Sequence, residues 1–211
     1  MVPGRTRRRS LIQLAGAAAL GALAPPRLAE AEPLSDPERA RLAGGELVSV
    51  PFDLNLPEGD YLGGVSYAVV RARPAEVMAV LADPDAYRAI LPMTLETRLI
   101  ARRGRDATVF FRQGTRLGSA GYVLLVRTES DTTVRFWLDA SRPHEIADLW
   151  GYFRVLPWTA SSSLLTYAAL LHLDFGVVKL LFSQKIREIA MTTPGLIRAY
   201  VEGHPRLGTP P

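Results

Sequence analysis

Alternating apolar and polar positions dominate the middle of the chain and predict a run of β-strands. The first is GVSYAVVRA at 64–72, where β-branched and aromatic residues follow one another over the length of a strand. Consecutive strands joined by short turns such as RGRD and ESDT pair most simply with their neighbours, so a sequential antiparallel sheet is expected. Six further strand segments follow the first, at 95–103, 107–115, 121–130, 132–140, 149–158 and 164–175.

Helical spacing of apolar residues occurs on either side of this run of strands. Pro74 and Pro84 begin two short helices, 74–83 and 84–91, because a proline at the first helical position sacrifices no hydrogen bond. Near the C-terminus the same spacing extends over 177–203 and predicts one long amphipathic helix. Pro194-Gly195 should kink or split that helix.

The chain before the first strand has a different composition. The segment 32–63 is rich in proline, glycine and acidic residues, with one short helix expected within 34–47 and an extended segment closed by a turn at 51–60. We expect this segment to be a leader to a single domain over 64–203. The last residues, 204–211, should be a flexible tail.

The first 31 residues have the pattern of an export signal. Clustered arginines precede a weakly apolar stretch and then small residues. Arg8-Arg9-Ser10-Leu11-Ile12-Gln13 resembles the twin-arginine motif, although Gln13 stands where a lysine is frequent. Ala29-Glu30-Ala31 predicts cleavage near Ala31. The sequence thus predicts export by the twin-arginine route, to the periplasm or outside the cell; an uncleaved anchor or a disordered basic tail are the alternatives.

Charge and cysteine content exclude several classes of function. The formal net charge is +4, but removing residues 1–31 removes five arginines and one glutamate and leaves 20 basic and 20 acidic residues. A formally neutral domain argues against nucleic acid as the partner, because phosphate backbones require a basic surface. The absence of cysteine excludes disulfides, a thiol nucleophile and cysteine-ligated zinc.

The order of these elements carries a family resemblance. One strand, two short helices, six antiparallel strands and a long C-terminal helix is the order of the helix-grip fold, an α+β fold in which a curved seven-stranded sheet wraps around the helix. The segments VSYAVVRARPAEVMAVLADPDAYRAILP, GYFRVLPW and SLLTYAALLHLD resemble the START/Bet v 1-like (SRPBCC) superfamily, which includes lipid-transfer and polyketide cyclase/dehydrase proteins. The resemblance implies a hydrophobic cavity between sheet and helix. Its motifs indicate the fold rather than the activity.

Strand alternation indicates which residues would line such a cavity. In TVRFWLDA the apolar Val134, Phe136 and Leu138 share one face, opposite Arg135 and Trp137. An inward aromatic residue more often fills the core than contacts a ligand, so core filling is the alternative for each of them. The complete set of predicted ligand-cavity residues is Met93, Phe111, Tyr122, Val134, Phe136, Leu138, Phe153, Val155, Leu165, Tyr167, Ala169, Leu171, Phe182 and Ile186.

Catalytic chemistry has weaker support in the sequence. The stretch HEIAD at 144–148 differs from the zinc motif HExxH at Asp148 and lacks a continuous helix, so no metal site is expected. We assign no catalytic residue; Tyr167, Arg112 and His144 are the candidates if the protein is an enzyme, with Arg112 facing inward only in the other strand register.

The sequence therefore favours an exported protein that binds or transfers a hydrophobic small molecule or lipid without a cofactor. A cofactor-independent cyclase, aromatase or dehydrase working through Tyr167 is the first alternative. The second is a protein-interaction module that uses aromatic residues of the outer face and rim. These aromatic residues are Trp137, Trp150, Tyr152 and Trp158, and together they could also form a patch that contacts a membrane surface.

Overall fold

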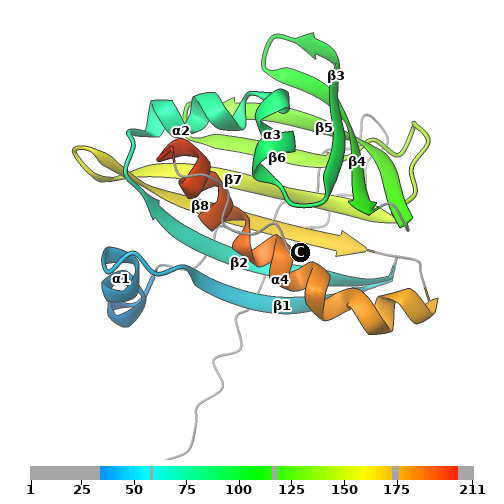
Figure 1. Cartoon of the computed structure of the whole chain (residues 1–211), viewed down its shortest axis with the longest axis horizontal. Coiled ribbons are helices and arrows are strands. Elements are labelled where there is room, and N and C mark those ends of the chain that lie inside the picture. The colour runs from blue at the N-terminus through cyan, green and yellow to red at the C-terminus, as the bar shows by residue number, and fades with distance from the viewer. Residues whose placement is uncertain (1–33, 58, 116–117, 173–175, 204–211) are drawn as a thin grey trace, which may run out of the picture. The chain divides into compact units, whose positions relative to one another are not determined.

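A computed structural model describes residues 34–57, 59–115, 118–172 and 176–203, without the side chains of 176–186 and 189. These residues form an eight-stranded antiparallel sheet and four helices, three of which lie on one face of the sheet (Figure 1). The elements are α1 (Asp36–Ala43), β1 (Val48–Leu56), β2 (Gly59–Val70), α2 (Pro74–Leu81), α3 (Pro84–Ile90), β3 (Thr94–Arg103), β4 (Asp106–Thr115), β5 (Gly118–Ser130), β6 (Thr133–Leu138), β7 (Asp148–Thr159), β8 (Ser162–His172) and α4 (Gly176–Val201).

The order of strands in the sheet is β1-β2-β8-β7-β6-β5-β4-β3. The first predicted strand, β2, therefore pairs with the last, β8, and β1 and β3 form the two edges. The helix α4 lies across the concave face and contacts β2, β8 and β1 (Figure 1). This arrangement confirms the predicted α+β helix-grip fold.

The predicted number of seven strands is wrong, because the segment before the expected domain contributes an eighth. The strand β1 pairs with β2 along its whole length, from Val48 opposite Tyr67 to Leu56 opposite Gly59. Its internal proline, Pro51, lies on an edge strand, where a missing backbone N–H can be tolerated. The boundaries proposed for the domain, the leader and the tail stay predictions.

The two short helices begin where the sequence predicts. Proline stands at the start of each, and the first turns are capped: the Glu76 carboxylate accepts the Arg73 backbone N–H at 2.7 Å, and the Asp83 carboxylate accepts that of Asp85 at 3.0 Å. Capping fixes the helix starts, and α3 then places its aromatic residue Tyr87 in the core, where it is only 7% exposed.

The long helix α4 is not split at its proline. The sequence predicted a kink or a split at Pro194-Gly195, and the split is wrong. The helix runs from Gly176 to Val201 as one element with Pro194 inside it. Pro194 is fully buried, and its neighbours Thr193 and Ile197 are 3% and 0% exposed. Burial of this turn against the sheet offsets the roughly 3 kcal/mol that an interior proline costs a helix.

Strand β1, which the sequence predicted only as an extended segment outside the domain, also holds α4 in place. Ser49 of β1 donates a hydrogen bond from its hydroxyl to the Met191 carbonyl at 3.4 Å, and Asp53 of β1 forms an ion pair with Arg187. These contacts tie the outermost strand to the helix that crosses the sheet. None of the helices in the described part of the chain combines the length and the apolar character needed to cross a bilayer.

Candidate functional site

The concave face of the sheet is the apolar centre of the molecule. It packs against α2, α3 and the C-terminal part of α4 in one buried cluster. Strand alternation predicted most of its sheet residues, most clearly in β6, although β7 and β8 are largely buried on both faces. Whether the residues line a cavity stays a prediction. Ten of those named for the cavity are in the cluster: Phe111, Tyr122, Val134, Phe136, Leu138, Phe153, Val155, Leu165, Tyr167 and Ala169.

The other four predicted residues lie elsewhere. Leu171 is partly buried and packs against the cluster. Met93 lies outside it, at the corner between α3 and β3, with φ of 58° and 43% of its surface exposed. The side chains of Phe182 and Ile186 are outside the described set.

Six aromatic rings of the cluster form two groups. Tyr87, Phe111 and Tyr122 make one group, with ring centroids 5.9 and 5.8 Å apart for consecutive pairs. Aromatic pairs at such separations add about 0.5–1.5 kcal/mol each to the burial of their surface. The second group is Phe136, Phe153 and Tyr167, with all three centroid separations between 4.9 and 6.1 Å.

The hydroxyls of the three core tyrosines are the main polar groups of this region. Tyr87 donates to the Leu81 carbonyl at 2.6 Å, which joins α3 to the end of α2. Tyr122 donates to the side-chain carbonyl of Gln113. Tyr167 is hydrogen-bonded to the Thr193 side chain on α4. Each phenol therefore has a partner inside the core, as buried hydroxyls require.

Burial keeps these phenols protonated. Desolvation raises the pKa of Tyr167 well above its ordinary value, although its hydrogen bond with Thr193 opposes part of the rise. Desolvation likewise raises the pKa of Tyr87 and Tyr122, and the charge that Tyr167 would carry on ionising raises both further. That electrostatic influence indicates that Tyr167 lies near both of the other tyrosines. At neutral pH the three can donate or accept hydrogen bonds, but none can act as a base.

Two of these residues, Tyr87 and Thr193, were missed as candidate site residues. Tyr87 follows the helix start at Pro84, and its place on the buried face of a short helix was the signal available in the sequence. Thr193 sits beside the proline of α4, where the sequence suggested a break rather than a buried contact.

The three alternative catalytic residues are not brought together. Tyr167 is buried in the core, whereas Arg112 is only partly buried and His144 is exposed. Arg112 follows the inward-facing Phe111 and therefore points to the other face, with its guanidinium 5.7 Å from the ring centre of Phe110. His144 is exposed in the loop 139–147, and its Nδ1 lies 2.7 Å from the Ile146 carbonyl oxygen.

The segment 144–148 is a loop that leads into β7, and its acidic residues serve the fold. Glu145 forms two hydrogen bonds with Gly121 of β5. Its carboxylate accepts the Gly121 N–H at 2.6 Å, and its own backbone N–H donates to the Gly121 carbonyl. Asp148 accepts the Tyr61 hydroxyl at 2.7 Å. Within the described residues, no group of three or more His, Asp or Glu side chains could hold a metal ion.

A small cavity lies beside Tyr87, at the junction of α2 and α3 with β3 to β6. Its volume is about 20 Å³, enough for one water molecule. A lipid or polycyclic ligand would have to occupy another part of the concave face or displace side chains. The lining includes Leu81, Tyr87, Val109, Val126, Val134 and Arg102.

The outer face of the sheet differs from the expected exposed aromatic patch. Trp150 and Tyr152 of β7 are only 3% and 5% exposed, and Trp137 and Trp158 are half-buried. Arginine side chains lie over this group, with Arg127 5.6 Å from the Trp137 ring centre. The residues do lie on the face opposite the core, but two of the four cannot form an exposed docking patch.

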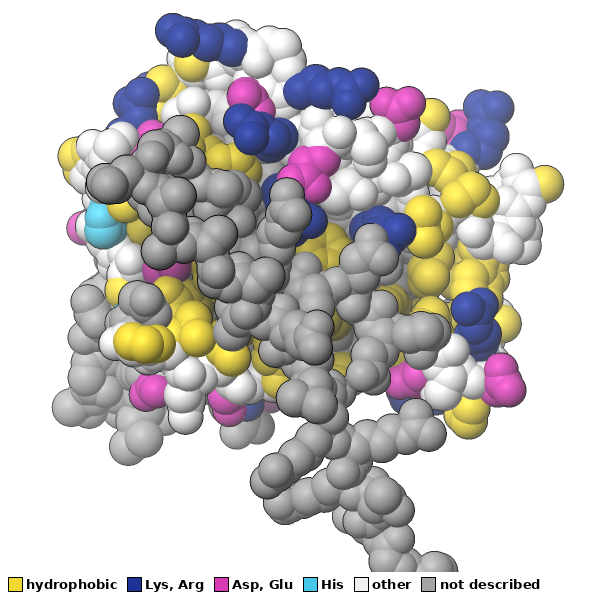
Figure 2. All heavy atoms as spheres, turned by 180° about the vertical axis from the view of Figure 1, so that it is seen from behind, with side chains coloured by type: hydrophobic (Ala, Val, Ile, Leu, Met, Phe, Trp, Pro, Cys, Tyr) yellow, Lys and Arg dark blue, Asp and Glu magenta, His cyan; other side chains and the backbone are white. Residues whose placement is uncertain are grey.

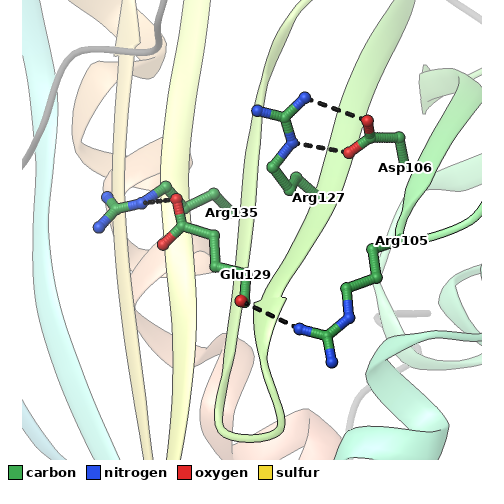
Figure 3. Close-up of polar contacts among 5 residues, drawn as sticks. All are labelled: Arg105, Asp106, Arg127, Glu129 and Arg135. Atoms are coloured by element: carbon green, nitrogen blue, oxygen red, sulfur yellow. Dashed lines mark hydrogen bonds and ion pairs between the residues drawn. The ribbon is translucent and has the colours of Figure 1, made fainter.

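Ion pairs cross β4, β5 and β6 on the same outer face (Figure 3). Arg127 and Arg135 lie directly opposite each other on neighbouring strands, an arrangement that repels. Asp106 accepts two hydrogen bonds from Arg127, at 2.7 and 3.0 Å, and Glu129 accepts one from Arg135 at 2.7 Å. The hydrogen bond from Arg127 lowers the pKa of Asp106 below its ordinary value. These contacts stabilise the sheet.

Comparison with known proteins places the fold. No family model matches the chain, and no curated protein matches it either. Among solved structures, a STAR-related lipid transfer protein from Xanthomonas axonopodis is similar with a TM-score of 0.58 at 15% identity, over 75% of this chain and 99% of that one. The Zhui aromatase/cyclase from Streptomyces sp. R1128 gives a TM-score of 0.57 at 11% identity, over 74% and 94%.

A START superfamily protein from Mycobacterium smegmatis gives a TM-score of 0.54 at 16% identity, covering 66% of this chain and 96% of that one. At such identities the similarity concerns the fold. The chain therefore has the helix-grip fold of START/Bet v 1-like proteins, as its sequence predicted.

Proposed function

We propose that this protein binds a hydrophobic small molecule or lipid between the concave face of the sheet and α4, and transfers it outside the cytoplasm. The observation that carries the proposal is the chemistry of the concave face. It presents six aromatic rings together with aliphatic side chains, and no charged side chain is buried among the described residues. Sites of this kind hold apolar ligands, with a few polar groups that orient them.

The polar groups present suit orientation better than catalysis. The phenols of Tyr87, Tyr122 and Tyr167 are neutral and hydrogen-bonded. A general base would have to lie within about 3 Å of the proton that it removes, and no carboxylate or imidazole is among the buried side chains that the structure describes. The solved structures of similar fold include a lipid transfer protein, which supports a carrier.

The export step of this proposal rests on the sequence of residues 1–31, which lie outside the described part of the chain. The arginine pair, the apolar stretch and the small residues before Ala31 support it. Cell fractionation with an antibody to the domain tests this step directly. A Lys-Lys replacement of Arg8-Arg9 should retain the protein in the cytoplasm.

The decisive experiment is native mass spectrometry of protein purified from the exporting cell, followed by organic extraction. We expect a bound molecule at a stoichiometry near one, with a mass that identifies its class. Tyr167→Phe should retain that molecule, because apolar contact dominates binding. An empty protein that also fails to bind added fatty acids, phospholipids and aromatic polyketides would contradict the proposal.

A cofactor-independent cyclase-like enzyme is the second candidate, favoured by the three neutral phenols. Neutral phenols can donate hydrogen bonds to a substrate carbonyl and so polarise it. A solved structure of similar fold is an aromatase/cyclase. Loss of turnover in Tyr167→Phe with unchanged substrate binding would establish this alternative over the carrier.

A further inference from the structure

The edge strand β3 exposes apolar side chains. Leu95 and Leu99 are each 42% exposed, and Met93, just before the strand, is 43% exposed. The described residues include five exposed large apolar side chains, and three of them fall within residues 93–99. Such a concentration on one edge indicates a contact surface rather than scattered surface residues.

The same edge is strongly basic. Residues 88–103, which include β3, contain four arginines and one acidic residue, in a domain that is formally neutral over 32–211. The acidic residue, Glu96, is ion-paired with Arg98, and Arg105 just beyond the strand is ion-paired with Asp131. Arg103 is exposed and forms no ion pair with a described residue. Figure 2, which views the molecule from behind, shows several dark blue side chains in its upper part, where magenta side chains also lie. The partner of this surface should therefore be negatively charged.

The backbone of β3 argues against an added strand as that partner. The pairing of β3 with β4 is interrupted by register shifts between Thr94 and Glu96 and between Leu99 and Ala101. Bulges and charged side chains are the devices by which edge strands resist pairing with other strands. A regular peptide strand would find no continuous ladder here.

We propose that β3 and the corner between α3 and β3 dock on an anionic phospholipid bilayer. Leu95, Leu99 and Met93 would enter the headgroup region, and the arginines would bind lipid phosphates. The inference deepens the proposed function, on which it rests, by naming the surface at which cargo would be exchanged. It replaces the patch predicted around Trp150 and Tyr152, which the structure buries.

Vesicle cosedimentation tests the proposal without any cargo. Protein purified from the exporting cell is mixed with vesicles of pure phosphatidylcholine, or of phosphatidylcholine with about one-third phosphatidylglycerol. We expect binding to the anionic vesicles alone, falling steeply as salt is raised from about 50 to about 500 mM, because salt screens exposed charges. Arg103→Gln should lower the partition coefficient about fivefold, and Leu99→Asn about fourfold.

Two matched variants control for exposure and charge. Val50→Asn changes an apolar residue that is 43% exposed on the opposite edge strand, and Arg41→Gln removes one positive charge from α1. Both should bind as the wild type does. Equal losses in Leu99→Asn and Val50→Asn, equal binding to neutral vesicles, or no binding at all would overturn the proposal. Protein that carries cargo yet ignores vesicles would overturn the docking surface and leave the proposed function intact.

Discussion

The phenol of Tyr167 on β8 is hydrogen-bonded to the side chain of Thr193 on α4. Tyr167 is 9% and Thr193 3% exposed, so this contact joins sheet and helix inside the core. It lies one residue before Pro194, where the helix loses a backbone hydrogen bond. The contact therefore stabilises the packing of the sheet against α4 at the turn where that helix lacks a backbone hydrogen bond.

Removing either partner should destabilise the fold. Thr193→Val leaves the Tyr167 phenol buried without its partner and should lower the free energy of unfolding by about 1–3 kcal/mol. Tyr167→Phe should cost about 1 kcal/mol. Urea denaturation of both variants and of the double variant completes a double-mutant cycle. We expect a coupling energy above about 0.5 kcal/mol, and a coupling energy of zero would show that the two side chains do not interact.

Gly59 should tolerate no side chain. Its φ is 143°, and a Cβ would lie 2.2 Å from Cε1 of His172. Gly59→Ala should therefore cost about 2–3 kcal/mol in thermal or urea unfolding, through strain and steric overlap. Gly118→Ala is the matched control, because no atom lies within 4 Å of the position that its methyl group would take. His172→Ala in the Gly59→Ala background should recover part of the loss, and the absence of recovery would rule out the overlap as the cause.

The core tyrosines should resist alkaline titration. Burial raises the pKa of Tyr87, Tyr122 and Tyr167 above the ordinary value of 10. A group whose pKa is raised in the folded state contributes stability that is complete below the unfolded pKa and is lost as pH rises toward the folded value. Absorbance near 295 nm should therefore show these phenols ionising only as the protein unfolds above about pH 10. Ionisation of all seven tyrosines in the folded protein would contradict this expectation.

The Asp106–Arg127 pair should contribute weakly and with a defined pH dependence. The pKa of Asp106 is lowered in the folded state from 3.8, so its contribution is complete above that pH and is lost as pH falls through the lower folded value. The carboxylate is 52% exposed, so solvent screening limits the effect to a few tenths of a kcal/mol. Asp106→Asn should reduce stability at pH 7 by that amount, and the difference should shrink at high salt. A loss that persists unchanged at pH 2 would not come from the charge.

The concave face could be predicted best where a strand alternates cleanly. In β6 the apolar Val134, Phe136 and Leu138 are buried, and the residues between them are less so. Where the alternation is absent, the sequence alone does not predict that a segment is a strand of the sheet. The segment 51–60 was predicted as an extended segment closed by a turn at Pro57, but not as a strand of the sheet. Pairing with β2 and the contacts of Ser49 and Asp53 with α4 make most of it part of strand β1.

The remaining differences have tertiary causes. Local propensity favours a break at Pro194, but burial against the sheet outweighs the lost hydrogen bond. Trp150 and Tyr152 lie on the face opposite the core, as alternation predicts, yet alternation alone cannot tell whether a face is covered. Tyr87 was missed because a seven-residue helix gives only a weak periodic signal for its buried side.

The pairing of β2 with β8 has a consequence for how the chain acquires its structure. Tyr61 and His172 are partners in the seam between β2 and β8, one strand in from the β1 edge of the sheet, although most of the domain separates them in sequence. A ribosome must therefore release β8 before the seam can close, and the loop entropy of that closure makes folding slow. Until then the incomplete sheet offers unpaired edges to other chains. A cell that makes this protein has to shield the nascent domain during that interval, whatever its final destination.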